Sequence, residues 1–168
     1  MLNSLKIFFV LALAALLSSG CAHYQKGDGN VVAFHSIAIA PVVNKSFAPQ
    51  ARTYVSESLV STFALGGKLA VLPEDQAETV LHVTLVSYDK NIGAKQSDDT
   101  GTARSLELVL GANIVLTDAT GNTLMAKSFE IHNEVYADSG ATRAENQAIP
   151  AMAHALAQQI YLAVIGKW

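Results

Sequence analysis

The chain has 168 residues, a formal net charge of −3 at pH 7 and a single cysteine. This mild acidity is unlike the basic surface that nucleic-acid binding needs, and one cysteine excludes both an intramolecular disulfide and a thiolate metal cluster. The length suits one domain that buries a core of its own.

Residues 1–20 have the features of a bacterial secretory signal peptide. Lys6 supplies the positive charge, and the apolar run Ile7–Leu17 suits a signal but is too short for a membrane-spanning helix. Small residues then lead to Cys21, as in lipoprotein signals, although Ser18 stands where leucine is usual. We predict that Cys21 carries diacylglycerol and palmitate. The alternatives are an ordinary cleaved signal that leaves a free thiol and an uncleaved membrane anchor.

Residues 21–33 are polar and rich in glycine, and we interpret them as a short tether between lipid and domain. In enteric bacteria an aspartate directly after the lipidated cysteine retains a lipoprotein in the inner membrane. Ala22 occupies that position here, which favours the periplasmic side of the outer membrane. Residues 34–168 are predicted to form a single domain.

The first half of this domain is predicted to hold a strand, a helix and a short extended piece. His35–Val43 is apolar on both faces, as in a covered strand, and Pro41 marks its end or a sheet edge. Gln50–Leu65 is predicted to be a helix that stops at Gly66-Gly67. Leu69–Leu72 is the extended piece. The apolar residues of the helix recur at every fourth position: Ala51, Val55, Leu59 and Phe63.

Three strands with alternating apolar residues follow: Thr79–Tyr88, Arg104–Asp118 and Thr123–Tyr136. A polar loop, Asp89–Ala103, separates the first two, and Gly121-Asn122 predicts a tight hairpin between the last two.

The last element is a predicted helix, Thr142–Lys167, because its apolar residues follow the helical period. Pro150 lies inside this pattern. It either begins the regular helix or kinks it, since proline removes a backbone donor and clashes with the preceding turn.

The order strand, helix, strand, strand, strand, helix (β-α-β-β-β-α) predicts an α+β fold. We expect a two-layer sandwich in which two helices pack on one face of a mostly antiparallel four-stranded sheet. Tyr88 is assigned to the face away from the helices, together with four valines: Val80, Val86, Val109 and Val115. That face is then partly apolar, which predicts a surface for a partner.

No enzyme motif is present, so we assign no catalytic residue, metal site or cofactor. The five histidines lack the spacing of metal ligands. Three basic residues cluster where the second and third strands join, namely Lys90, Lys95 and Arg104, and Lys127 on the last strand could neighbour them. We favour a solvated strand end, and the functional alternative is a cationic tip for the phosphates of a lipid headgroup.

Several segments occur together in the order known from one family: Gly20–Tyr24, Ile37–Asn44, Leu72–Leu81, two leucine-rich hairpin strands and a terminal helix ending in Trp168. In these features the chain resembles the LptE family of lipopolysaccharide-assembly lipoproteins. The resemblance implies two helices against a four-stranded sheet, and a role as plug and assembly partner of the outer-membrane β-barrel LptD. It also implies contact with lipopolysaccharide (LPS) through basic residues, here those around Lys90, Lys95 and Arg104.

The opening strand and helix are also similar to outer-membrane lipoproteins that activate peptidoglycan synthases or build secretion pores, and these are the alternative. A barrel plug predicts apolar sheet and helix surfaces that become buried only with LptD. A synthase activator predicts a polar exposed patch and a long tether. The short tether, residues 21–33, favours the plug.

Overall fold

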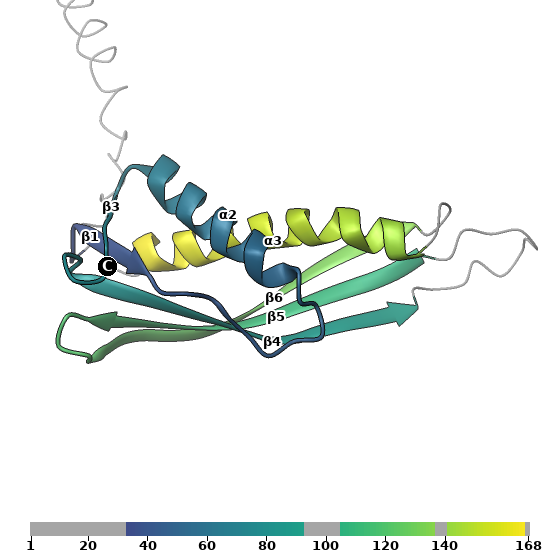
Figure 1. Ribbon diagram of the computed structural model, residues 1–168, viewed down its shortest axis with the longest axis horizontal. Helices are drawn as coiled ribbons and strands as arrows, with labels where there is room; N and C mark the ends of the chain where they lie inside the picture. The colour runs from purple at the N-terminus through teal and green to yellow at the C-terminus, as the bar shows by residue number, and fades with distance from the viewer. Residues whose placement is uncertain (1–32, 93–104, 137–140, 167–168) are drawn as a thin grey trace, which may run out of the picture. The chain divides into compact units, whose positions relative to one another are not determined.

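The computed structural model describes residues 33–92, 105–136 and 141–166 of the chain. These residues form six strands and two helices (Figure 1), which are, in chain order, β1 (Ser36–Ile39), β2 (Val43–Asn44), α2 (Ala51–Gly66), β3 (Ala70–Val71), β4 (Thr79–Ile92), β5 (Ser105–Asp118), β6 (Thr123–Tyr136) and α3 (Ala141–Gly166).

The six strands make one mixed sheet in the order β3-β1-β4-β5-β6, with β2 also paired to β4. β4, β5 and β6 form an antiparallel meander, whereas β1 runs parallel to β3 and β4, and β2 runs parallel to β4. The prediction of an α+β fold is confirmed, but the prediction of four strands is wrong, and the sheet is not purely antiparallel.

Two features explain the additional strands. The single strand predicted over His35–Val43 is divided by a break at Ala40–Val42, where Pro41 cannot donate a backbone hydrogen bond, so β1 and β2 are separate. The extended piece Leu69–Leu72 supplies β3, which joins the sheet beside β1. A parallel neighbour needs a crossover connection, and α2 provides it between β1 and β3.

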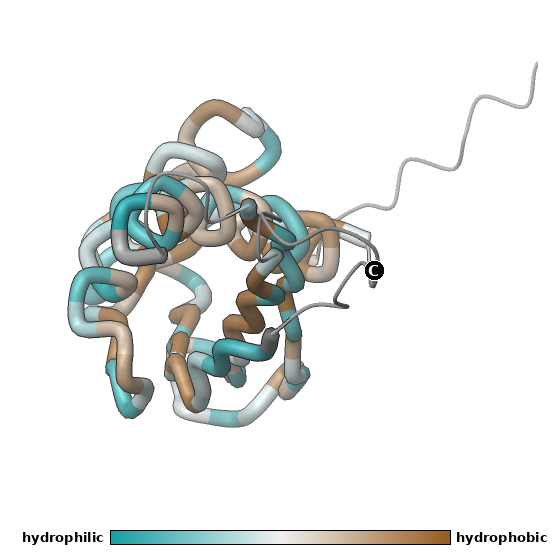
Figure 2. The backbone as a smooth tube through the Cα atoms, turned by 90° about the vertical axis from the view of Figure 1, so that its right-hand side faces the viewer, coloured by the Kyte–Doolittle hydropathy of each residue, from teal (hydrophilic) through white to brown (hydrophobic). Residues whose placement is uncertain are grey.

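Both helices lie on the same face of the sheet, which gives the two layers (Figures 1 and 2). α2 buries the four residues predicted from its period: Ala51, Val55, Leu59 and Phe63. The fully buried large side chains of α3 are Ile149, Met152 and Leu156, and those of β5 are Leu108, Leu110, Ile114 and Leu116. Each such side chain contributes about 1.5–3 kcal/mol of transfer free energy, so the interface between helices and sheet is the core.

Pro150 lies inside α3, which begins at Ala141, so it does not start the helix. Arg143–Gly166 is the only stretch among the described residues that is long and apolar enough to cross a membrane, with a mean hydropathy of 1.4. In this structure, however, Ile149, Met152 and Leu156 lie in the core under α3. The core helix of a water-facing domain has the same composition as a membrane span, so length and hydropathy alone assign no membrane span here.

A β-bulge at Val86 changes which side chains of β4 face the helices. Leu85 pairs with Ala112 and Tyr88 pairs with Leu110, so three steps along β4 match two steps along β5. Because side chains alternate along a strand, the extra residue moves every later residue of β4 to the opposite face. The assignment of Tyr88 to the face away from the helices is therefore wrong, and Tyr88 is buried in the core.

The turn between β5 and β6 is organised by one carboxylate. Asp118 accepts hydrogen bonds from the backbone N–H groups of Thr120 and Asn122, both at 2.9 Å, and from their side chains. These donors lower the pKa of Asp118 to about 2. Gly121, at φ 87°, takes the left-handed conformation that the predicted tight hairpin requires.

The end of α2 is held against α3 by Tyr161. Its hydroxyl donates a hydrogen bond of 3.0 Å to the carbonyl oxygen of Gly66. Its ring meets Phe63 edge-on, with ring centroids 5.2 Å apart. The ring lies so close to the Cα of Gly66 that a methyl group there would overlap it. Gly67, at φ 65°, then ends the helix.

We predict that Gly66→Ala destabilises the domain by about 1–3 kcal/mol, because Tyr161 must leave its position over α2. The matched control is Gly166→Ala, where the added methyl group meets no atom within 4 Å. Urea unfolding of the two variants and the wild type measures the difference in free energy of unfolding. Equal stability of the two variants would contradict the proposed contact.

Candidate functional site

The structure places two of the four basic residues considered above, and these two lie far apart. Lys95 and Arg104 lie outside the described residues, so only Lys90 and Lys127 can be placed. Lys90 pairs with Leu108 of β5, and Lys127 pairs with Ile114, six residues further along the same strand. At a rise of about 3.3 Å per residue this is a separation of about 20 Å along the sheet. Lys127 therefore does not neighbour Lys90.

Lys90 forms an ion pair with a residue of the last helix. The bulge at Val86 places it on the side of the helices, where its Nζ donates to Oε2 of Glu145 at 2.6 Å. The Glu145 side chain is 15% exposed and the Lys90 side chain 50% exposed. The ammonium also lies 5.7 Å from the ring centre of Tyr88. The pair thus joins β4 to α3, and Lys90 would have to break it to bind a phosphate.

Tyr88 completes this contact between β4 and α3. Its burial raises the pKa of the phenol well above its usual range, and the negative charge of Glu145 raises it further. The hydroxyl is buried and has no hydrogen-bond partner of good geometry among the described residues. We interpret Tyr88, Lys90 and Glu145 as a structural contact that fixes the start of α3 on the sheet.

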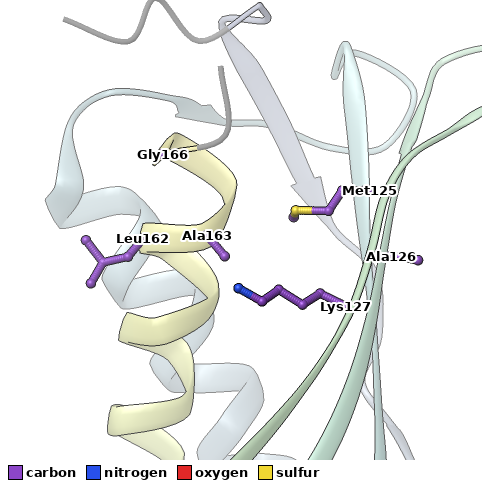
Figure 3. Close-up of a pocket in the computed structure, with 6 residues that line it drawn as sticks. All are labelled: Met125, Ala126, Lys127, Leu162, Ala163 and Gly166. Carbon is purple, nitrogen blue, oxygen red and sulfur yellow. The ribbon is translucent and has the colours of Figure 1, made fainter. Parts of the chain in front are cut away.

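Lys127 is placed differently, beside an open cavity between β6 and α3 (Figure 3). The cavity has a volume of about 360 Å³ and is lined by Met125, Ala126, Lys127, Leu162, Ala163 and Gly166. Figure 3 shows the Lys127 side chain extending from β6 toward α3. Its Nζ lies 5.2 Å from the ring centre of Phe129. Among the described residues no carboxylate lies within ion-pair distance of Lys127.

A second open groove lies between the two helices. Its volume is about 520 Å³, and its lining residues are Ser61, Thr62, Leu65, Gly66, His154, Gln158, Tyr161 and Leu162. Leu65 and Leu162 are 84% and 62% exposed, values that are unusual for leucine on helices that pack on a core. Leu162 also lines the cavity beside Lys127, so the two hollows meet at this side chain.

The sheet face away from the helices is apolar at one end and acidic at the other. Val80 is buried there with Ala38 and Ala77. Val86 is exposed, and two further valines, Val109 and Val115, are half-buried. The predicted apolar character of this face therefore holds in part.

Toward the other end of that face, His132 lies between two carboxylates. Its Nδ1 is 3.0 Å from Glu107 Oε1 and its Nε2 is 3.9 Å from Glu130 Oε2. Glu134 lies opposite Glu107 in the register of β5 and β6. Such a surface repels phosphates. The two-residue period of β6 could have revealed this acidic surface from the sequence.

Among residues 33–92, 105–136 and 141–166, no three His, Cys, Asp or Glu side chains converge in a way that could hold a metal ion. What the described residues offer instead are surfaces: two hollows with apolar walls, one of them with Lys127 at its border, and an acidic sheet face.

Comparison with known families identifies the protein's relatives. Residues 34–164 match the LptE family, described as lipopolysaccharide-assembly. The match covers most of the chain. The chain belongs to the LptE family. The resemblance noted in the sequence is thereby confirmed, and LptE is a lipoprotein family of LPS assembly rather than a family of enzymes.

Solved structures share the fold of this LptE-family chain at low sequence identity. A protein from Xanthomonas campestris is 13% identical, with a TM-score of 0.57 over 80% of this chain and 89% of that one. Uncharacterized lipoprotein B from Nitrosomonas europaea is 18% identical, with a TM-score of 0.55 over 80% and 84%. The PelC dodecamer from Paraburkholderia phytofirmans is 18% identical, with a TM-score of 0.51 over 78% and 88%. No protein of curated function matches the sequence.

Proposed function

We propose that this protein is an outer-membrane lipoprotein of the LPS transport and assembly machinery, and that it acts as plug and assembly partner of an LptD-type β-barrel. The observation that carries the proposal is the family match over residues 34–164. The role is non-enzymatic: the domain would support barrel assembly and help LPS pass to the cell surface.

The exposed apolar side chains support a role that depends on a large partner. Leu65 and Leu162 stand out from the helical layer, and Val43 and Val86 are exposed at the sheet. Solvent-facing side chains of this size cost free energy unless another surface covers them. A barrel that encloses the domain would cover helix and sheet surfaces together.

Attachment to the membrane would be through Cys21. Each acyl methylene buried in the bilayer contributes about 0.8 kcal/mol, so several chains together give stable anchoring. Residues 21–33 can span at most about 45 Å when fully extended. The tether would therefore keep the domain close to the periplasmic leaflet, where it can reach a barrel in the same membrane.

Lipidation predicts that palmitate supplied to the growing cells labels the wild-type protein and fails to label Cys21→Ala. The matched control is Ser18→Leu, which restores the usual residue of a lipoprotein signal and should be labelled at least as well as the wild type. Equal label in Cys21→Ala and the wild type would exclude attachment at Cys21.

The partnership with a barrel predicts that affinity purification of the tagged protein from its own outer membrane recovers LptD in a stoichiometric complex. Double substitution of Leu65 and Leu162 to Glu should reduce the recovered LptD, because both exposed side chains are proposed to be covered. Recovery of peptidoglycan synthases or secretion-pore components without LptD would favour the alternative role.

LPS contact is proposed at two separate places, at Lys127 beside the cavity and at Lys95 and Arg104 in the segment that joins β4 to β5, with Lys90 less directly involved. Lys127 combines a cation with apolar walls, as an amphiphile with a phosphate and acyl chains requires. Lys90 is already paired with Glu145. The acidic face around His132 would turn the phosphates away from the opposite side of the sheet.

We predict that Lys127→Ala weakens binding of fluorescent LPS about threefold, whereas Lys90→Ala leaves binding near the wild-type value and lowers the free energy of unfolding by about 1–2 kcal/mol. The control is Lys68→Ala, an exposed lysine outside both hollows. Wild-type LPS binding by a variant that lacks Lys127, Lys95 and Arg104 together would show that these residues do not form the contact.

A further inference from the structure

Among the strands that the structure describes, β6 is the last of the sheet on one side, and its residues Met125–Tyr136 pair with β5 alone. β6 comprises 14 residues and is the last strand in the order β3-β1-β4-β5-β6. The opposite edge is built from short pieces, because β3 and β2 have two residues each. Figure 1 shows β4, β5 and β6 as the three long strands beneath the helices.

β6 has only one of the features by which proteins usually protect an edge, the inward-pointing charge of Lys127. Natural edge strands are short, bulged or interrupted by proline, or carry charges that point inward. The register with β5 is unbroken from Met125 to Tyr136, and that stretch contains no proline. Lys127 is the only charged residue of that stretch on the side of the helices. A regular row of backbone donors and acceptors therefore faces outward along β6.

The two sides of this edge differ in character. On the helix side, Met125 and Lys127 border the open cavity under Leu162. On the other side, β6 presents Glu130 and Glu134 and neither lysine nor arginine. A strand added beside β6 would thus place alternate side chains over an apolar hollow and next to carboxylates.

A second copy of this chain fits the edge poorly. Opposite residues of two paired strands point to the same side of the sheet. Pairing of β6 with itself would bring two further carboxylates to a side that already holds Glu130, Glu134 and Glu107, without a lysine or arginine to offset them. Like charges that lie opposite each other destabilise a strand pair. The charge pattern therefore selects a partner of different sequence.

We propose that β6 pairs with an extended segment of the barrel partner, which adds to the sheet as a further strand. This inference rests on the proposed function. A closed barrel has no free strand edge, so the added segment comes from a loop or terminal stretch outside the barrel wall. Its chemistry follows from the edge: lysine or arginine at alternate positions facing Glu130 and Glu134, and apolar side chains facing Leu162.

Hydrogen–deuterium exchange on the full-length lipoprotein tests this inference. The lipoprotein alone is compared with its purified LptD complex in the same detergent. We expect alternate backbone amides between Met125 and Tyr136 to exchange at least about tenfold more slowly in the complex, because a new strand accepts their hydrogen bonds. Amides of the central strand β5 are bonded on both sides already and should change little.

The outcomes separate the two proposals. A complex that forms without slower exchange in β6 overturns the added strand and leaves the LptD partnership standing. Slow exchange in β6 of the lipoprotein alone, with a dimeric mass by light scattering, shows a second copy on the edge and also overturns it. Failure to form any LptD complex overturns both.

Charge reversal gives an independent readout. Glu130→Lys combined with Glu134→Lys should weaken LptD binding about tenfold, because two attractive contacts become repulsive. The matched control is Glu57→Lys combined with Glu74→Lys, which changes the net charge equally at exposed sites away from β6. Equal affinity of both double variants contradicts a basic segment beside β6.

Discussion

The packing of α3 against the meander of β4, β5 and β6 is the interaction on which the rest of the structure depends. Ile149, Met152 and Leu156 of its inner face share one buried core with the leucines of β5. α2 is then fixed on α3 through Tyr161, and the start of α3 is fixed on β4 through the Lys90–Glu145 pair. Both hollows lie along the second half of α3, so their shape also depends on this packing.

A helical layer on one face leaves three kinds of surface uncovered: the outside of the helices, the opposite sheet face and the edge of β6. Each has its own chemistry. The helix groove is apolar around Leu65, the far end of the sheet face is acidic around His132, and the edge of β6 offers backbone hydrogen bonds. A protein that must fit against a much larger partner can use all three, whereas an enzyme needs one site with convergent reactive groups.

Local periodicity was enough to predict most elements. The four-residue period of α2 and the two-residue period of β5 correctly assigned their buried faces, because each depends only on near neighbours in sequence. The bulge at Val86 could not be predicted in this way. The extra residue of β4 becomes apparent only when β4 is paired with β5. Glu145, the partner of Lys90, lies 55 residues away in the sequence, so no local pattern indicated that Lys90 forms an ion pair. Likewise, the parallel strands β1 and β3 are joined through a whole helix, and no local pattern indicates their pairing.

We propose that this LptE-family protein serves the delivery of LPS to the outer membrane. Its most direct test is depletion of the protein from its own cells, followed by pulse-labelled LPS and separation of the two membranes. After depletion we expect newly made LPS to accumulate before it reaches the outer membrane, and re-expression of the wild-type protein to restore delivery. Undiminished arrival of LPS at the cell surface after depletion would contradict it.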